Sequence, residues 1–361
     1  MSDNSYAVVL AGGRGERFWP KSTEQCPKQL LPLAGKQPLL VEAVARLQPL
    51  IPQERVLILT NAALIPAIRQ AMPDFPTGNI IGEPCGRDTA PAVATAVAII
   101  KARCPTASLV VLTADHVIGD LPVFQQTLAD SLQLAASEDT LVTIGIRPLT
   151  PSTGFGYLEA GDELSHKGAT KFHRVRRFVE KPDMPTAEQY LAAGNYYWNS
   201  GMFAWSVATF ESAAGRHHPE LTTIIEQLSP LADKPMFEER LAEVYDKTQK
   251  ISVDYAIMEK SRNIAMAQAL FRWDDVGTWS ALAKHFPADA DGNVTIGRAA
   301  LLDSGNNIID AGDNLIALIG VNDLVVVQHN NATLICPKNR DQDVKKIVEQ
   351  LRQRPDCRGW L

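Results

Sequence analysis

Short apolar segments alternate with longer, helix-like segments through the first 150 residues of the chain. Buried strands are predicted at 6–10, 56–59, 80–82, 109–112 and 141–146. Helices are predicted between them, at 39–50, 61–72, 89–103 and 123–136. Strands that alternate with helices of this length form parallel βαβ units, so the pattern predicts an α/β fold with a doubly wound, mostly parallel sheet.

The pattern changes twice after residue 150. Strands become shorter and glycines more frequent between 150 and 206, and helices are predicted to resume between 209 and 260. After residue 293, short apolar runs with no long helix between them are followed by a closing helix at 342–352. We therefore predict a larger domain of residues 1–287 and a small β-rich domain of residues 293–361, similar to part of a β-helix.

Composition narrows the classes of function. The chain is 45% hydrophobic, but no stretch approaches the length of about eighteen apolar residues that a membrane span needs. The apolar run at 7–11 is too short for a signal peptide, and the five cysteines form neither a CxxC pair nor a disulfide framework, which favours the cytoplasm. A net charge of −6 argues against general nucleic-acid binding, yet it allows a small anionic substrate at one positive site.

A positive cluster of this kind follows the first predicted strand. Gly12, Gly13 and Gly15 fall within four positions, and the basic residues nearby are Arg14, Arg17, Lys21 and Lys28. Glycines let backbone N–H groups turn toward a phosphate. The segment matches neither the G-x-G-x-x-G fingerprint nor the G-x-x-x-x-G-K-[ST] loop. It predicts a phosphate-binding loop of another kind, and the alternative is a tight turn with solvated charges.

Two acidic residues are candidates for a metal site. Asp115 follows the strand predicted at 109–112, at the edge where open α/β sheets bind ligands. Asp275 lies in an aromatic, glycine-rich segment far along the chain, next to Asp274. Mg²⁺ is usually held by one or two carboxylates together with substrate phosphates. From the residues alone, Asp115 could equally cap a helix and Asp275 could form a turn.

The opening loop resembles the signature G-G-x-G-x-R-L-x-P-L-T…P-K of sugar nucleotidyltransferases. The motifs that follow resemble one branch, the bacterial mannose-1-phosphate guanylyltransferases (GDP-mannose pyrophosphorylases), over essentially the whole chain. The matching segments are GEP at 82–84, GRDTAPA at 86–92, TADH at 113–116, GFGYLE at 154–159, FVEKP at 178–182, WNSG at 198–201, DYAIMEK at 254–260 and WDDVGTW at 273–279. Asp88 departs from the family pattern, in which we expect Asn. The chain resembles a short form of the family without the isomerase domain of longer relatives.

This resemblance implies a Rossmann-like nucleotidyltransferase that transfers GMP from GTP to α-D-mannose 1-phosphate by direct in-line displacement. It implies that Arg17 and Lys28 support the triphosphate and that Lys181 contacts the sugar phosphate. It further implies that Mg²⁺ is held by Asp115 and by Asp275 rather than Asp274. His116 would then support Asp115 instead of binding the metal.

The resemblance also implies the substrate contacts and a homodimer. The sugar phosphate would contact Gly156, Glu180, Lys181 and Asn199. The nucleotide would contact Leu10, Ala11, Gly12, Gly13, Arg14, Gly15, Glu83, Pro84, Thr89 and Ala90. Guanine offers N–H donors, so Glu83 or a carbonyl near it would accept from the base. From the residues alone, Glu180 and Lys181 could instead form a surface ion pair.

Other functions stay open at this point. The same chemistry could act on dTTP or UTP, or on a manno-heptose 1-phosphate. A non-catalytic regulatory subunit that binds nucleotide-sugar is the third possibility, although the charged residues that such a subunit would have lost are all present. The failed G-x-G-x-x-G match disfavours an oxidoreductase. We expect neither a nucleic-acid nor a membrane partner.

Overall fold

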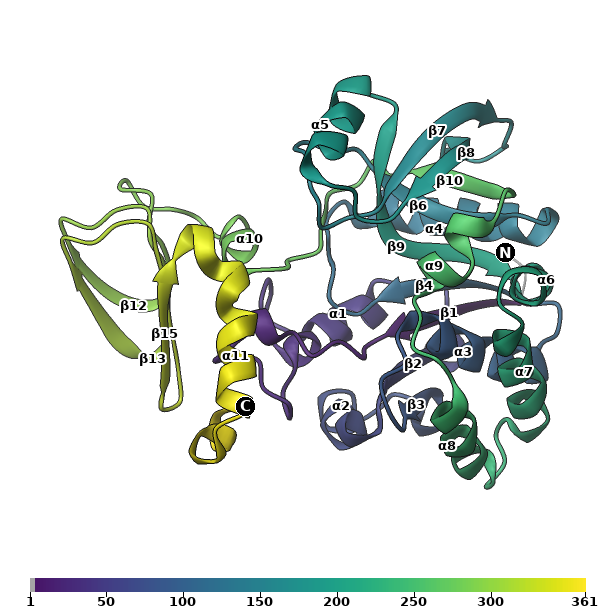
Figure 1. Ribbon diagram of the computed structural model, residues 1–361, viewed down its shortest axis with the longest axis horizontal. Coiled ribbons are helices and arrows are strands. Elements are labelled where there is room, and N and C mark those ends of the chain that lie inside the picture. The colour runs from purple at the N-terminus through teal and green to yellow at the C-terminus, as the bar shows by residue number, and fades with distance from the viewer. Residues whose placement is uncertain (1–3) are drawn as a thin grey trace.

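The computed structural model describes residues 4–361, and over this range a nine-stranded sheet forms the centre of the larger part of the chain (Figure 1). Its strand order is β3-β2-β1-β4-β9-β6-β10-β8-β7. The strands are β1 (Ser5–Leu10), β2 (Val56–Asn61), β3 (Ile80–Glu83), β4 (Ser108–Thr113), β6 (Leu141–Ile146), β7 (Tyr157–Leu164), β8 (Phe172–Val179), β9 (Tyr196–Ser206) and β10 (Ile264–Gln268). All five strands predicted before residue 150 are present.

Most strands of this sheet point in the same direction, as the alternation of strands and helices predicted. β1 pairs in parallel with β2 and β4, and β10 pairs in parallel with β6. β9 runs antiparallel between β4 and β6, and β7 and β8 form an antiparallel pair at one edge. Outside this sheet, two short strands, β5 (Val117–Ile118) and β11 (Trp273–Asp274), pair with each other. The α/β prediction is confirmed.

Helices cover both faces of the sheet because successive strand residues point to opposite sides. Val8 points into a core shared with α3, α6, α7 and α8, whereas Ala7 and Val9 point into a second core with α1, α2 and α4. The helices are α1 (Leu39–Ala45), α2 (Ile65–Ala71), α3 (Thr89–Arg103), α4 (Leu121–Ser137), α5 (Met184–Ala193), α6 (Val207–His217), α7 (Pro219–Leu228), α8 (Phe237–Lys247), α9 (Val253–Ala256), α10 (Trp279–Ala283) and α11 (Val344–Arg352). Within residues 4–361, no helix is long and apolar enough to cross a membrane.

The first helix is shorter than its hydrophobic pattern predicted. The prediction ran from 39 to 50, but α1 ends at Ala45. Pro49 has no backbone N–H to continue a helix, and it disfavours the helical conformation at the residue before it. The side-chain amide of Gln125 donates to the carbonyl oxygens of Arg46 at 2.9 Å and Gln48 at 2.5 Å. These contacts hold the segment after α1 as a turn against α4.

The segment after residue 293 forms a smaller sheet. Its strands are β12 (Val294–Leu302), β13 (Ile308–Ile319), β14 (Leu324–His329) and β15 (Ala332–Pro337). The first three pair in parallel at similar positions, as in the rungs of a β-helix, and β15 returns antiparallel along β14. In Figure 1, α11 (yellow) lies between this sheet and the purple N-terminal segment.

A third hydrophobic core joins the smaller sheet to the opening loop. It contains Phe18 and Trp19 from the loop, Trp279 from α10, and apolar residues from β13, β14, β15 and α11. The rings of Phe18 and Trp279 meet edge to face with centroids 5.1 Å apart. Both side chains are almost fully buried. The opening loop and the segment around α10 therefore rest on the smaller sheet.

Replacing Trp279 tests this third core. We expect Trp279→Ala to lower the free energy of unfolding by about 3–5 kcal/mol, because it removes a large, fully buried ring. Urea denaturation followed by circular dichroism measures the change. Leu149→Ala is the matched control, since Leu149 is 85% exposed and its loss should change stability by less than about 0.5 kcal/mol. Equal effects of the two substitutions would contradict the proposed importance of the core.

Candidate active site

The loop after β1 folds back so that Gly15 meets Lys28. Gly15 has a φ of 61°, and a Cβ at this position would lie 2.3 Å from the Cβ of Lys28. Glycine is needed for both the conformation and the close approach. A cavity of about 350 Å³ opens in front of this contact, and we call it the charged cavity. Its lining residues are Arg14, Gly15, Glu16, Arg17, Phe18, Lys28, Asp115, His116, Asp275, Gly277 and Lys345.

Lys28 connects the loop to two distant segments of the chain. It is 5% exposed, and its ammonium donates to the Oδ2 atom of Asp115 at 2.9 Å and to the backbone oxygen of Asp275 at 2.7 Å. The same ammonium lies 5.7 Å from the centre of the Phe18 ring, within the range of a cation–π contact. The structure thus brings together Lys28, Asp115 and Asp275, which were predicted from separate motifs.

The pairing of β5 with β11 explains how the two acids meet. Asp115 comes shortly before β5 and Asp275 directly after β11, and these strands are antiparallel. Asp274 is engaged elsewhere, because it accepts the backbone N–H of Val276 at 2.7 Å and lies 3.1 Å from Nε2 of His285. Of the two adjacent acids, Asp275 lines the charged cavity and Asp274 does not.

Burial and neighbouring charges determine the protonation of this site. Burial alone would raise the pKa of Asp115, but the charge of Lys28 and the hydrogen bond that Lys28 donates bring it below its ordinary value. Burial raises the pKa of Asp275, and Lys28 opposes that rise. Burial also lowers the pKa of His116 to about 4, so its neutral ring accepts the indole N–H of Trp273 at 3.1 Å. Asp115 is therefore an anion near neutral pH, held in place by the ammonium of Lys28.

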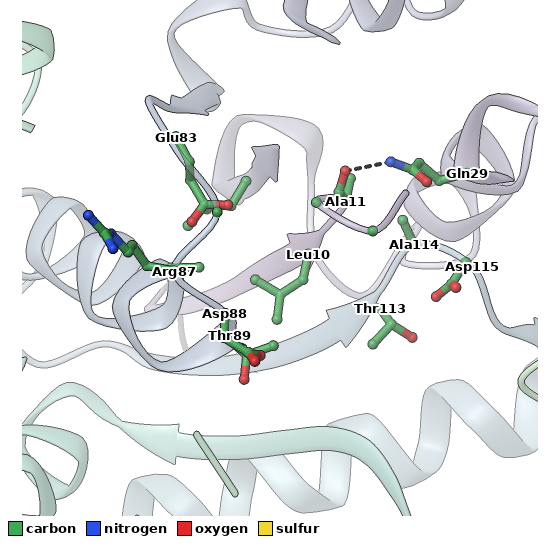
Figure 2. A pocket seen from close by; sticks show the side chains of 15 residues that line it. Leu10, Ala11, Gln29, Glu83, Arg87, Asp88, Thr89, Thr113, Ala114 and Asp115 are labelled. Carbon is green, nitrogen blue, oxygen red and sulfur yellow. Dashed lines mark hydrogen bonds between the residues drawn. The ribbon is translucent and has the colours of Figure 1, made fainter. Parts of the chain in front are cut away.

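A second cavity of about 300 Å³ lies at the carboxyl ends of β1, β2, β3 and β4, and we call it the strand-end cavity. It is lined by Leu10, Ala11, Gly12, Gly13, Gln29, Leu59, Glu83, Gly86, Arg87, Asp88, Thr89, Ala92, Thr113, Ala114 and Asp115. Figure 2 shows Leu10 and Ala11 between Glu83 on one side and Gln29 on the other. The Gln29 amide donates to the Ala11 carbonyl at 2.6 Å. The hydroxyl of Thr113 is buried in the cavity wall and has no protein partner among residues 4–361.

Glu83 is a buried carboxyl group on the wall of the strand-end cavity. It accepts a hydrogen bond from the Tyr245 hydroxyl at 3.1 Å. Burial raises the pKa of Glu83 to about 7, the Tyr245 hydrogen bond opposes this, and the charge of Asp88 adds to it. Asp88 itself caps α3 by accepting the N–H of Thr89 at 2.8 Å. Asp88, for which the family resemblance suggested Asn, therefore adds negative charge near Glu83.

A third group of polar residues, which we call the β9 cluster, lies around β9. Asn199 donates to Asp254 at 2.8 Å, and a Cβ at Gly156 would lie 2.4 Å from a carboxylate oxygen of Glu180. Lys181 forms an ion pair with Glu180 at 2.9 Å. Burial, together with the charge of Glu180, raises the pKa of Asp254 to about 6. Asp254 was not among the predicted site residues, although it begins the matching segment at 254–260.

Some residues named from the sequence lie apart from the cavities. Pro84 is exposed, and Ala90 is fully buried with its N–H donated to the Ile251 carbonyl at 3.1 Å. Neither lines the strand-end or the charged cavity. Lys21 turns away from the charged cavity and pairs with Asp310 of the smaller sheet at 2.5 Å. The nucleotide contacts of Pro84 and Ala90 remain predictions.

Comparison with known proteins agrees with this geometry. Residues 6–292 match the model of the nucleotidyl transferase family, and residues 297–351 match a MannoseP isomerase/GMP-like beta-helix domain. The fold and the cavities at the strand ends thus belong to a nucleotidyltransferase, and the chain is an enzyme of this class.

Individual relatives show which branch of this class the chain belongs to. A mannose-1-phosphate guanylyltransferase of Klebsiella pneumoniae is 39% identical over 348 residues, 96% of this chain and 74% of the relative. The xanthan biosynthesis protein XanB of Xanthomonas campestris pv. campestris is 35% identical over 96% of this chain and 73% of its own. A crystal structure from Thermus thermophilus, described as a mannose-1-phosphate geranyltransferase, is 38% identical, with a TM-score of 0.85 and coverage of 97% of this chain and 99% of its own. The chain belongs to the mannose-1-phosphate guanylyltransferase family, which confirms the resemblance inferred from its motifs.

The raised pKa of Glu83 gives a testable pH dependence. Its ordinary value is 4.5 and its value in the fold is about 7, so the folded chain holds this proton more tightly than the unfolded chain. The contribution of this proton to the free energy of unfolding is fully present below pH 4.5, the ordinary pKa, and is lost as the pH rises through about 7. The free energy of unfolding of the wild type should therefore fall as the pH rises from about 5 to about 8. For Glu83→Gln, which has no carboxyl group here, we expect this fall to be smaller by roughly 2–3 kcal/mol in urea titrations. Parallel pH profiles would contradict the assignment.

Proposed function

We propose that this enzyme transfers GMP from GTP to α-D-mannose 1-phosphate, which releases pyrophosphate and forms GDP-mannose. The observation that supports this most directly is the contact of Lys28 with Asp115 and with the backbone of Asp275, inside a cavity that also contains Arg17. A polyanion can bind here because cations and a metal-binding pair of acids are concentrated in one place of an otherwise acidic chain.

The three parts of the site correspond to the parts of the two substrates. The base and ribose occupy the strand-end cavity, where Glu83, Thr113 and backbone groups offer polar contacts. The triphosphate extends past Asp115, which lines both cavities, into the charged cavity. Mannose binds at the β9 cluster, where Glu180 and Asp254 offer acceptors for hydroxyl groups. Lys181 contacts its phosphate.

The reaction needs no general base or protein nucleophile. A phosphate oxygen of mannose 1-phosphate is already an anion and attacks the α-phosphorus in line with the departing pyrophosphate. The difficulty is to bring two anions together and to stabilise the charge that moves to the leaving group. Arg17 and Lys28 support the triphosphate, and the position of Lys28 is fixed by its hydrogen bonds before the substrate arrives.

The acids of the charged cavity fit Mg²⁺. Asp115 and Asp275 supply hard carboxylate oxygens, and within residues 4–361 no group of three or more His, Cys, Asp or Glu side chains could hold a metal by itself. Mg²⁺ is commonly held by one or two carboxylates while substrate phosphates complete its shell. We propose that these two acids hold it with the nucleotide. When bound, the ion neutralises phosphate charge and polarises the phosphoryl oxygens.

Pyrophosphate release tests the proposal. The protein is assayed with GTP, mannose 1-phosphate and Mg²⁺, and then with ATP, UTP and dTTP and with other sugar 1-phosphates, including a manno-heptose 1-phosphate. We expect the highest kcat/KM for GTP with mannose 1-phosphate. A higher value for another pair would reassign the substrates, and no turnover with any pair would indicate a non-catalytic nucleotide-sugar-binding subunit.

Single substitutions test the roles of Lys28 and Asp115. We expect Lys28→Ala and Asp115→Ala each to lower kcat by about a hundredfold or more, the scale of losing one preorganised electrostatic group. Lys36→Ala is the control, because Lys36 lies exposed in the turn before α1 and lines neither cavity. Near-normal turnover in either variant would remove that residue from the mechanism. Adding EDTA to the wild type should abolish activity, and excess Mg²⁺ should restore it.

We also propose that the enzyme is a homodimer that works in the cytoplasm. Leu302, Leu315 and Ile319 form an exposed apolar row on β12 and β13, and Leu302 pairs directly with Ile319. Such a row favours contact with a second copy. The five cysteines are unpaired, which suits a reducing compartment. Sedimentation should find a dimer for the wild type and a monomer for Ile319→Asp, and a monomeric wild type would refute the assembly.

A further inference from the structure

A lysine from the end of the chain lies at the charged cavity. Lys345 stands in the first turn of α11, and it lines the cavity together with Arg14, Arg17 and Lys28. Its side chain is 55% exposed, and the acid nearest to it, Glu349, is 3.8 Å away. A pair this long and exposed contributes little, so the ammonium of Lys345 can turn to an anion in the cavity.

The charges around the cavity leave three cations for a ligand. Lys28 is paired with Asp115 at 2.9 Å, and Glu16 lies 3.7 Å from Arg14 and 2.9 Å from Arg352. Among the cavity residues that the structure describes, Arg17 forms no ion pair, and Arg14 and Lys345 form only long, exposed ones, at 3.7 and 3.8 Å. A pyrophosphate group carries several negative charges, which a single cation does not balance.

The backbone of Lys345 is held in place against the opening loop. Its neighbours Val344 and Val348 are buried in the third hydrophobic core with Phe18. At the other end of α11, Arg352 bonds to Glu16 in the loop itself. Figure 1 shows α11 lying along the N-terminal segment. Lys345 therefore has a fixed place at the cavity although it comes from the smaller sheet's closing helix.

We propose that Lys345 is a further catalytic residue, which binds the β- and γ-phosphates of the nucleotide and the pyrophosphate that leaves. This inference rests on the function proposed above. Charge moves to the leaving group as its bond to the α-phosphorus breaks, so a cation at that end stabilises the transition state and the departing anion. The C-terminal part of the chain thereby supplies a substrate contact to the catalytic site.

Separate substitutions of Lys345 and of its neighbour Lys346 test this role. Lys345→Ala should raise the KM for GTP, and for pyrophosphate in the reverse reaction, by about tenfold or more, the effect of losing one charge-assisted hydrogen bond. The KM for mannose 1-phosphate should change by less than about twofold, and Lys345→Arg should restore most of the loss. Lys346→Ala is the matched control, because Lys346 is the next residue, pairs with Asp343 at 2.8 Å and does not line the cavity.

Calorimetric binding separates this inference from the proposed function. Lys345→Ala should weaken binding of pyrophosphate with Mg²⁺ by about tenfold and leave binding of GMP within about twofold, because GMP has no β- or γ-phosphate. If wild type binds pyrophosphate through Lys345 but turns over no GTP with mannose 1-phosphate, the function fails and the phosphate site stands. If turnover is normal and Lys345→Ala behaves like Lys346→Ala in both assays, the inference is wrong. Equal weakening of GMP and pyrophosphate binding would also overturn it, since that would indicate a general structural effect.

Discussion

The buried ammonium of Lys28 is the interaction on which the rest of the site depends. Removing a lysine charge from water costs several kcal/mol unless close partners offset the loss. Here the partners are the carboxylate of Asp115 and the backbone oxygen of Asp275, which come from segments far apart in the sequence. The same contacts keep Asp115 ionised and oppose the rise in the pKa of Asp275. One cation thus positions the loop and prepares two acids, so little rearrangement is left for the time when substrate arrives.

The parts of this arrangement that the sequence could predict are local. Apolar runs bounded by turn residues were enough for the first five strands, because strands buried on both faces are continuously apolar. β9 could not be found in this way, since Asn199 and Gly201 interrupt its pattern and its partners lie elsewhere in the chain. The family signature singled out Lys28 rather than Lys21, but it named neither partner, and only the tertiary fold brings Lys21 to Asp310 and Lys28 to Asp115. The domain boundary at 287–293 stays a prediction.

Backbone contacts of residues 251–253 link the strand-end cavity to the β9 cluster. The N–H of Ile251 donates to the Arg87 carbonyl, and the N–H of Val253 donates to the Thr89 hydroxyl. Arg87 and Thr89 line the strand-end cavity, and the residue after Val253 is Asp254 of the β9 cluster. The backbone of residues 251–254 therefore joins the wall of this cavity to the β9 cluster. Contacts of this kind cannot be derived from the motifs, since each motif shows only its own residues.

The smaller sheet is part of the site's construction because the opening loop has little regular structure of its own. The loop contains only the short 3₁₀ turns Glu16–Phe18 and Lys28–Leu30, so few backbone hydrogen bonds fix its shape. Side-chain contacts to the C-terminal part take their place: the Trp19 indole donates to the Trp360 carbonyl at 2.8 Å, and Lys21 pairs with Asp310. A loop that must hold Lys28 within hydrogen-bond distance of Asp115 needs such support from outside. The same packing that stabilises the loop also carries α11, with Lys345 in its first turn, to the edge of the charged cavity, so one interface positions both the loop and this helix.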